Sequence, residues 1–290
     1  MNNGPFLEKP QCILCGQTEE RILFQKKSPA GEIFTLVRCT RCGLQYVSPR
    51  PSEEMMSRYY GESYFSKRTD RGYNNYFSPE IRKEIERVIT LNLADLDFFH
   101  YENSIMDTKK SLDIGCAAGY FVAYLNSRGW DSEGIDISAD CINFAQKELK
   151  LKTECDDYLK KEYPEKFHLI TLWASIEHLH NPQSVIEKAY HDLHENGYLY
   201  ISTCRVGGFN AMKLFRKNWR FYNFPEHLYF FSHRTLLQLL SRYGFTIERY
   251  KTYGSGIGSS GSITKRISDI TVKIFDAGDM MLVSARKLKR

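Results

Sequence analysis

From residue 111 onward, short apolar runs alternate with stretches in which apolar residues recur at helical spacing. The apolar runs predict strands at residues 111–115, 132–137, 152–155, 168–173 and 197–203. The periodic stretches predict helices at residues 119–128, 139–149, 183–194 and 233–242. This alternation predicts a parallel, doubly wound α/β sheet that binds its ligand at the carboxyl ends of the strands. A last apolar run at 280–285 follows a tight turn, which would let that strand return antiparallel.

The segment before residue 111 has a different pattern. Apolar residues at helical spacing predict one long amphipathic helix over residues 79–101, with Ser78 as its N-cap and Pro79 at its first position. A shorter helix is expected from Ser52 to about residue 60. Strand-like runs before it occur at residues 21–25, 33–38 and 44–48.

Two Cys-x-x-Cys-Gly motifs lie among these strand-like runs, with Cys12 and Cys15 in the first and Cys39 and Cys42 in the second. Two residues between the thiols let both sulfurs face one ion, and the glycine lets the chain turn beneath it. Four thiolates in two such motifs predict a closed, structural zinc site. Disulfides and an iron–sulfur cluster are the alternatives. A cytosolic setting argues against the first, and the glycines favour zinc over the second.

The sequence SLDIGCAAGYFVAYL, at residues 111–125, has the order of a strand, a tight turn and a helix. Asp113 lies in the strand, and the turn contains Gly115, Ala117 and Gly119. Small residues let a ligand approach the backbone closely, and the amides at the start of the helix carry partial positive charge. The stretch therefore predicts a nucleotide-like ligand at this strand end.

Acidic residues at the next strand ends indicate which ligand this is. Asp136 ends the second strand, about twenty residues beyond the glycine turn, where an acid accepts hydrogen bonds from two ribose hydroxyls. A helix cap is the other interpretation of Asp136, although Ser138 is a better cap nearby. Asp156 and Asp157 follow the third strand, where a carboxylate or backbone group meets an adenine amine. We expect a ribose and an adenine at these two positions.

The turn GCAAG at residues 115–119 lacks the full Gly-x-Gly-x-x-Gly pattern of dinucleotide sites. It resembles motif I of the class I S-adenosylmethionine-dependent methyltransferases, in which an acid stands two residues before the first glycine, as Asp113 does. Asp136, the following acidic pair and SIEHL at residues 175–179 stand where that family has its other motifs. Ala117 departs from the family, which usually has glycine there. The resemblance implies a Rossmann-like seven-stranded sheet with its last strand antiparallel.

The same resemblance implies a site for S-adenosylmethionine at the carboxyl edge of the sheet. An aromatic cluster around Tyr64 precedes the sheet, and it is either packing or a lid over this cofactor. The residues expected to bind the cofactor are Tyr64, Asp113, Gly115, Cys116, Ala117, Gly119, Asp136, Ile137, Asp156, Asp157, Trp173 and Ser175.

The chain as a whole is similar to bacterial zinc-ribbon methyltransferases, many of which are thought to act on sugars in polysaccharide or deoxysugar pathways. The similarity rests on the cysteine motifs, a Pro-Arg-Pro turn at 49–51 and YYGESYF at 59–65. It also rests on FPEHLYFFS at 224–232, which is similar to a motif of sugar C-methyltransferases. Those enzymes are typically longer than this chain. The resemblance implies a zinc ribbon at 1–50, a helical linker and lid at 51–104 and a methyltransferase domain at 105–290, with a substrate-binding insertion at about 204–232.

Two histidines are candidates for a base that would remove a proton from the methyl acceptor. His178 follows the fourth strand and so faces the predicted ligand cleft, although a structural role there is equally consistent with its position. His227 lies in the aromatic insertion, where we favour a catalytic role. Glu226, beside it, is a candidate for orienting substrate hydroxyls.

Composition sets limits on the partners. The formal net charge is +5, which fits an anionic, sugar-linked small molecule as well as an ordinary solvated surface. No apolar run has the ~18 residues of a membrane span, and the first residues do not have the pattern of a secretory signal, so a cytoplasmic location is expected. An RNA methyltransferase remains an alternative, although no long basic run is present. A non-catalytic protein with this fold is a third.

Overall fold

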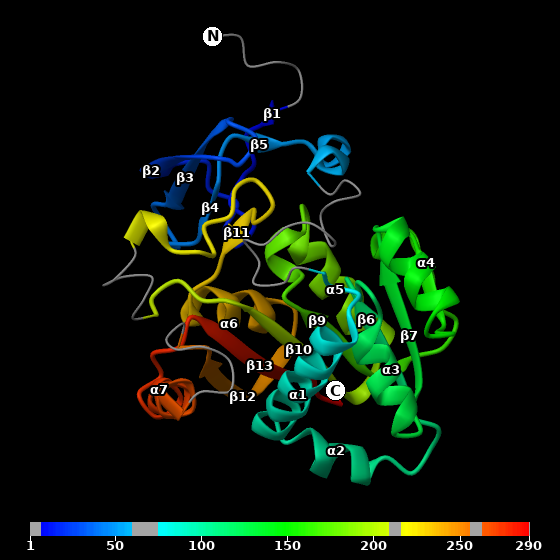
Figure 1. Ribbon diagram of the computed structural model, residues 1–290. Coiled ribbons are helices and arrows are strands. Elements are labelled where there is room, and N and C mark those ends of the chain that lie inside the picture. The colour runs from blue at the N-terminus through cyan, green and yellow to red at the C-terminus, as the bar shows by residue number, and fades with distance from the viewer. Residues whose placement is uncertain (1–6, 60–74, 209–215, 256–262, 290) are drawn as a thin grey trace.

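The computed structural model describes residues 7–59, 75–208, 216–255 and 263–289. Within these residues, a seven-stranded sheet has the order β12-β13-β10-β9-β6-β7-β8 (Figure 1). Its strands are β6 (Lys110–Ile114), β7 (Asp131–Asp136), β8 (Thr153–Cys155), β9 (Phe167–Trp173), β10 (Leu193–Cys204), β12 (Phe245–Tyr253) and β13 (Met280–Lys287). The strands β6 to β10 run parallel, whereas β13 runs antiparallel to β10 and β12. This arrangement confirms the predicted Rossmann-like sheet with an antiparallel last strand.

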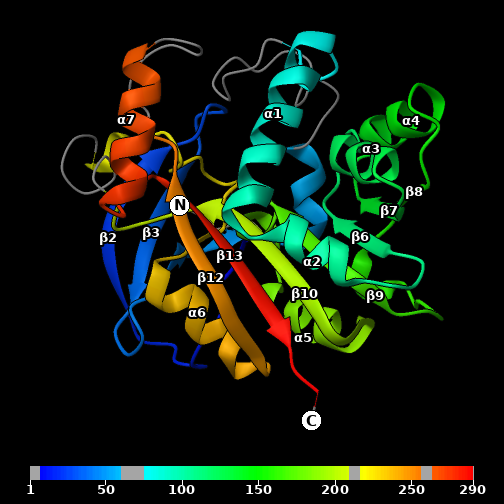
Figure 2. The ribbon, with the colours of Figure 1, turned by 90° about the horizontal axis from the view of Figure 1, so that it is seen from below.

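Helices cover both faces of this sheet (Figure 1, Figure 2). One face carries α1 (Pro79–Asp95), α2 (Phe98–Ser104), α3 (Tyr120–Ser127) and α4 (Ala139–Lys147), and the other carries α5 (Pro182–Asp192) and α6 (His233–Arg242). Neighbouring residues of a strand point to opposite faces, so Leu169 joins the core beneath α1 and α2, whereas Ile170 joins the core beneath α5 and α6. Both side chains are fully buried, as expected for the centre of a doubly wound sheet.

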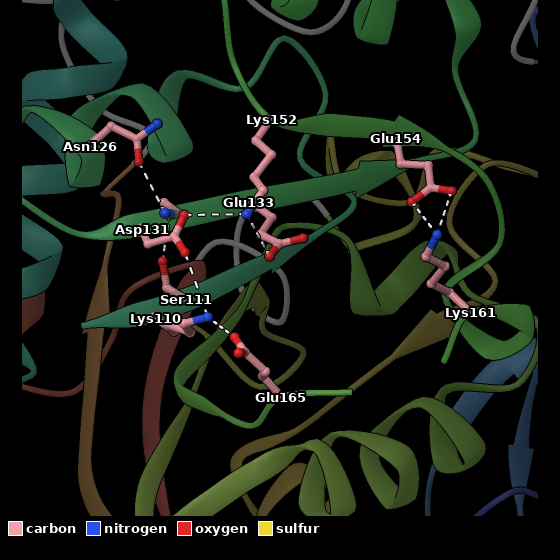
Figure 3. Close-up of polar contacts among 10 residues, drawn as sticks. Lys110, Ser111, Asn126, Asp131, Glu133, Lys152, Glu154, Lys161 and Glu165 are labelled. Carbon is pink, nitrogen blue, oxygen red and sulfur yellow. Dashed lines mark hydrogen bonds and ion pairs between the residues drawn. The ribbon is translucent and has the colours of Figure 1, made fainter. Parts of the chain in front are cut away.

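Ion pairs join the strands at one end of the sheet (Figure 3). Lys152 Nζ, just before β8, lies 3.4 Å from Asp131 Oδ1 and 3.3 Å from Glu133 Oε1, both on β7. On β6, Lys110 Nζ lies 3.8 Å from Asp131 Oδ2 and also pairs with Glu165. These side chains are partly exposed, so each pair contributes at most about 1 kcal/mol. Burial of the strands, rather than these pairs, stabilises the sheet.

A second sheet contains the predicted ribbon and one strand from a distant part of the chain. It has the order β11-β4-β3-β2, with β2 (Glu20–Lys27), β3 (Ile33–Cys39), β4 (Gln45–Val47) and β11 (Tyr229–Phe230). All its neighbours pair antiparallel. Before it, β1 (Leu7–Glu8) pairs with β5 (Arg50–Pro51). Because β11 belongs to the insertion after β10, the ribbon and the insertion share one sheet, and Figure 1 shows β11 beside β4.

The prediction of one long helix over residues 79–101 is wrong, because the structure has two helices, α1 and α2, in this region. The break occurs at Asp97, whose φ of 62° is left-handed. Aspartate tolerates this conformation better than most residues. The break lets both Leu96 and Phe98 enter the core, where they are 2% and 0% exposed. The apolar pattern therefore continues across the break and hides it from a periodicity argument.

Other elements differ from expectation near the two ends of the described chain. The predicted helix after Ser52 is the 3₁₀ helix η1 (Glu53–Arg58). Helix α7 (Ile263–Ile274) has no counterpart among the predicted elements. Strand β12 lies outside the residue ranges predicted as strands, although the expected seven-stranded sheet implied one strand beyond those ranges. Among those described, no helix is long and apolar enough to cross a membrane.

Candidate active site

The glycine turn between β6 and α3 is tightly packed. Gly115, Ala117 and Gly119 have φ values of 72°, 46° and 74°, all left-handed. A Cβ on Gly115 would lie 2.6 Å from Cβ of Ser175, which follows β9. The Ser175 hydroxyl donates to the Ile114 carbonyl at 2.9 Å, so the loop after β9 is fastened to the start of the turn. Ala117 has a left-handed conformation that favours glycine, which is the residue usual at this position in the motif that the turn resembles.

Asp136 lies directly beside this turn, at the end of β7. Its Oδ2 accepts a hydrogen bond from the Ala117 amide at 2.8 Å, and its Oδ1 accepts one from the Ser138 amide at 2.8 Å. Ser138 itself caps α4. Burial raises the pKa of Asp136, and the backbone hydrogen bonds oppose that rise. Each carboxylate oxygen has a second lone pair, so Asp136 can hold the turn and still accept hydrogen bonds from ribose hydroxyls.

The next residue, Ile137, is 66% exposed although it is large and apolar. Asp156 is also exposed, after β8, and accepts a hydrogen bond from the Asp157 amide at 2.7 Å. Asp157 caps the short helix η3 (Tyr158–Lys160) through a 2.9 Å bond from the Leu159 amide. An exposed apolar side chain beside exposed polar groups suits a flat heterocycle such as adenine. The predicted adenine contacts are therefore sterically open, and they stay predictions.

Two of the predicted cofactor residues lie deeper. Asp113 is 3% exposed, and its Oδ1 accepts a hydrogen bond from the Thr171 hydroxyl at 2.6 Å. Burial raises the pKa of Asp113 to about 7, and the Thr171 hydrogen bond opposes the rise. Cys116 is buried, and a Cβ on Gly134 would lie 2.7 Å from its sulfur. These two side chains are packed under the turn and contact other residues of the protein, Thr171 in the case of Asp113 and Gly134 in the case of Cys116.

Trp173 ends β9, and its ring packs edge-on against Phe121 with centroids 5.2 Å apart. Its indole Nε1 is buried and makes no hydrogen bond to a described residue. Tyr64 lies outside the described residues, so its predicted cofactor contact stays a prediction. The strand ends thus combine a small-residue turn, a carboxylate and an exposed apolar side chain. This set of groups fits S-adenosylmethionine.

The two candidate histidines meet, although 48 residues lie between them. The rings of His178 and His227 are 4.6 Å apart and nearly perpendicular, at 87°. His178 ends the short helix η4 (Ile176–His178), directly after β9. Two backbone hydrogen bonds position His227, since its own amide donates to the Asn223 carbonyl at 2.9 Å and the Leu228 amide donates to the Glu177 carbonyl at 2.8 Å. The insertion therefore places a second imidazole beside the first.

Three residues that the sequence argument did not single out surround this pair. The Glu177 carboxylate is 1% exposed and accepts a hydrogen bond from the Thr203 hydroxyl at 2.9 Å. Burial raises the pKa of Glu177 to about 7. Cys204 Sγ lies 3.9 Å from His227 Nδ1, and burial raises the pKa of its thiol well above the ordinary value.

The sequence contained a partial signal for this group. Glu177 immediately precedes His178 in a motif at the end of a buried strand, where an acid is unusual. The ligating atoms of Glu177, Cys204 and His227 all lie within 4.8 Å of one another, so this set could also hold a metal ion. Cys204 is a buried thiol, and only the fold brings it to His227. Glu226, predicted beside His227, is 2% exposed and therefore buried, and its predicted contact with substrate hydroxyls stays a prediction.

Comparison with known proteins identifies the family. A family described as a methyltransferase domain matches residues 77–250, which is more than half of the chain. This chain belongs to the methyltransferase domain family. The match covers the glycine turn, both acidic strand ends and both histidines. The expectation of a methyltransferase is thereby confirmed at the level of the family.

Individual relatives of this methyltransferase domain are distant. A ubiquinone biosynthesis O-methyltransferase of Glaesserella parasuis is 32% identical over 124 residues, which are 39% of this chain and 52% of that protein. One from Pseudomonas putida is 31% identical over 102 residues, or 33% of this chain and 44% of that protein. The chain thus spans about half the length of the curated relatives it matches. A methyltransferase structure described as SAM dependent, from Archaeoglobus fulgidus, has a TM-score of 0.51 at 19% identity and covers 70% of this chain and 94% of that one, which shows the same fold.

The four N-terminal cysteines form a separate cluster in this methyltransferase. Cys12 Sγ lies 3.4 Å from Cys42 Sγ, and Cys15 Sγ lies 3.4 Å from Cys39 Sγ. All four sulfurs lie within 4.8 Å of one another. The glycine after each pair has a left-handed φ, as the chain turns beneath the cluster. Four thiols at these separations fit a tetrahedral zinc ion.

Proposed function

We propose that the protein transfers a methyl group from S-adenosylmethionine to a sugar-linked small molecule, either a nucleotide sugar or a precursor of a surface polysaccharide. The observation that carries the proposal is the meeting of His178 and His227. His178 belongs to the loop after β9, which also contains the Ser175 contact to the glycine turn. His227 belongs to the insertion. The pair thus joins the cofactor-binding edge of the sheet to a segment that can bind an acceptor.

The protein's part in this reaction is to orient the acceptor and take up its proton. S-adenosylmethionine supplies an electrophilic methyl group, so transfer depends mainly on holding the acceptor atom in line. In our proposal, the glycine turn and Asp136 hold the cofactor. His227 accepts the proton of the acceptor hydroxyl, and His178 fixes the orientation of that imidazole.

Features of the insertion support an anionic, sugar-linked acceptor. The segment at 224–232 resembles a motif of sugar C-methyltransferases, and Glu226 lies in it. Arg216, Lys217 and Arg220 are exposed in the same insertion, where guanidinium and ammonium groups suit a diphosphate. The curated relatives reported above are named O-methyltransferases, which favours an oxygen as the acceptor atom.

The test uses cofactor binding and turnover together. Calorimetry should show that the purified protein binds S-adenosylhomocysteine, and a panel of nucleotide sugars should then be assayed for methyl transfer. His227→Asn should lower kcat by about 10²–10⁴-fold, the usual effect of losing a general base, with cofactor affinity unchanged. His100→Asn is the matched control, because His100 is exposed on α2 far along the chain from the site. Absence of cofactor binding by the folded protein would refute the proposal, whereas cofactor binding without transfer to any sugar would refute only the acceptor class.

We also propose that the four-cysteine cluster holds a structural zinc ion. The donor set is closed, with four thiols and no place for a substrate, which suits a structural role. Elemental analysis of the purified protein should find about one zinc per chain, and Cys39→Ser should lose it. A chain that is folded and free of zinc would contradict this assignment.

A further inference from the structure

Helix α7 exposes a continuous apolar stripe. Four isoleucines follow one another at spacings of four, three and four residues, which places them on one face of a helix. Their exposed fractions are large: Ile263 75%, Ile267 60%, Ile270 59% and Ile274 71%, with Phe275 at 75% just beyond the helix. Surface helices of globular proteins normally turn such a stripe inward. The outward stripe therefore calls for an explanation.

Polar contacts fix α7 in this orientation. On its inner side, Asp269 Oδ1 accepts a hydrogen bond from the Ser255 amide at 2.9 Å, and the Ser255 and Ser268 hydroxyls are 2.9 Å apart. Lys273 pairs with Asp95 at the end of α1. The helix thus presents polar side chains to the protein and isoleucines to the outside. Rotating the stripe inward would break these contacts, so the exposure is built into the packing.

Helix α7 lies at the same edge of the sheet as the candidate active site. Helix α7 follows the carboxyl end of β12, which runs parallel to β10, so it stands at the same edge of the sheet as the glycine turn. Arg205, the first residue after β10, donates through its amide to the Asp279 carbonyl at 2.7 Å and pairs with Asp276 at 3.3 Å. The end of α7 is therefore tied to the start of the insertion. Figures 1 and 2 both show α7 at the periphery of the molecule.

We propose that α7 binds the surface of an anionic lipid bilayer, lying in the plane of the interface with its isoleucines in the lipid. The sequence from residue 263 to 275 contains Lys265, Arg266 and Lys273 against a single acid, Asp269. Asp269 accepts a hydrogen bond from the Ser255 amide and Lys273 pairs with Asp95, so the basic excess of the segment rests on Lys265 and Arg266. An apolar stripe accompanied by excess basic residues is the pattern of interfacial helices on anionic membranes. The proposal goes beyond methyl transfer and does not depend on it.

The size of the stripe argues against a second copy of the chain as its partner. Five side chains with these exposures present on the order of 100 Å² each, or roughly 500 Å² per copy. Two copies would bury about 1,000 Å², below the ~1,200 Å² at the lower end of stable protein interfaces. A lipid surface accepts a narrow stripe and compensates the positive charge.

Vesicle co-sedimentation of the full chain tests this proposal without any turnover. The protein should sediment with vesicles of phosphatidylglycerol and phosphatidylcholine, less in high salt, and little with phosphatidylcholine alone. Ile267→Ser combined with Ile270→Ser should weaken the sedimentation at least about tenfold. The matched control is Ile22→Ser combined with Ile33→Ser, because these isoleucines are 65% and 67% exposed on the ribbon strands β2 and β3. The control should sediment like the original protein.

Several results would overturn the proposal. Failure of the original protein to sediment with anionic vesicles would do so, as would equal losses in the α7 variant and the ribbon control. Sedimentation equilibrium should find the same oligomeric state for both variants and the original. A change from dimer to monomer in the α7 variant alone would identify a second copy as the partner instead. Binding of S-adenosylhomocysteine, measured in parallel, shows that each variant is folded and separates this test from that of the proposed function.

Discussion

Ala117 carries a conformational cost that a single substitution would remove. Its φ of 46° is left-handed, a conformation that costs a non-glycine residue on the order of 1–2 kcal/mol. Ala117→Gly removes this cost, but glycine loses about 0.5–1 kcal/mol more conformational entropy on folding. We therefore expect a net gain in the free energy of unfolding of about 0.5–1 kcal/mol, measured by urea denaturation. The neighbouring Ala118→Gly is the control and should destabilise, because Ala118 is fully buried and is not left-handed.

Asp113 should make stability depend on pH. Burial raises the pKa of Asp113 to about 7 in the folded protein, with nearby Asp136 adding to the rise, whereas the unfolded value is near 4. Between those values the folded state holds more protons than the unfolded state, so this group makes stability fall as the pH rises from 4 to 7, by up to about 1.4 kcal/mol per pH unit.

Asp113→Asn removes this titration, so the variant should lose less stability than the original protein between pH 5 and pH 7. Urea denaturation at pH 5, 6 and 7 measures the difference. Thr171→Val is the companion variant. It removes the hydrogen bond that opposes the rise in the pKa of Asp113, and its stability should fall with pH over a range that extends higher. Parallel pH curves for all three proteins would show that Asp113 does not titrate in this range.

At the scale of the element, α6 offers a test of local sequence signals. Ser232 Oγ accepts a hydrogen bond from the Thr235 amide at 3.2 Å, and Thr235 Oγ1 accepts one from the Ser232 amide at 2.9 Å. This reciprocal cap precedes a helix whose Leu236 and Leu239 are fully buried. Ser232→Ala should lower the free energy of unfolding by about 1 kcal/mol. Ser241→Ala, on the exposed side of the same helix, should be neutral or slightly stabilising, and equal effects of the two changes would contradict a capping role.

Elements whose residues bury a face within one strand or helix could be predicted from the sequence. The strands β6 and β9 are nearly continuous apolar runs because both of their faces are covered. Strand β12 was missed because it lies at the edge of the sheet, where charged side chains interrupt the apolar pattern. Helix α7 was missed for a related reason, since its stripe is not matched to any core. The local apolar pattern thus predicts elements that are buried in the core, and it fails for elements at an edge of the sheet or on the surface.

At the scale of the whole molecule, the cofactor side of the site could be predicted and the acceptor side could not. The glycine turn at residues 115–119 and Asp136 are 17 to 21 residues apart, and a single βαβ unit brings them together. The contact of His178 with His227 depends instead on a crossing of the insertion toward the ribbon sheet. The spacing of apolar residues along the sequence gives no sign of such a crossing. Glu177 and Cys204 were overlooked because their significance arises only from that crossing.

This crossing predicts that the proposed zinc ion affects the proposed methyl transfer from a distance. Leu228 links the two parts, because its carbonyl accepts a hydrogen bond from the Val47 amide at 2.9 Å in the ribbon and its amide donates to the Glu177 carbonyl at 2.8 Å beside the histidines. If zinc is removed, β4 loses its support, β11 loses its partner strand, and His227 loses its position.

Chelation of zinc, or Cys39→Ser, should therefore lower kcat for methyl transfer at least about tenfold while changing the affinity for S-adenosylhomocysteine less than about threefold. The reason for the difference is that the glycine turn and Asp136 belong to the other sheet. The core beside the turn, formed by Cys116, Val122 and Ile142, contains no ribbon residue, although the core on the opposite face of that sheet includes residues of both sheets. Ile22→Ser is the control, since Ile22 is 65% exposed on β2 of the ribbon, outside the cysteine cluster. It should leave both quantities unchanged. Full turnover without zinc would show that the ribbon does not position His227, and parallel loss of cofactor binding would show that the ribbon supports the whole fold rather than the acceptor side alone.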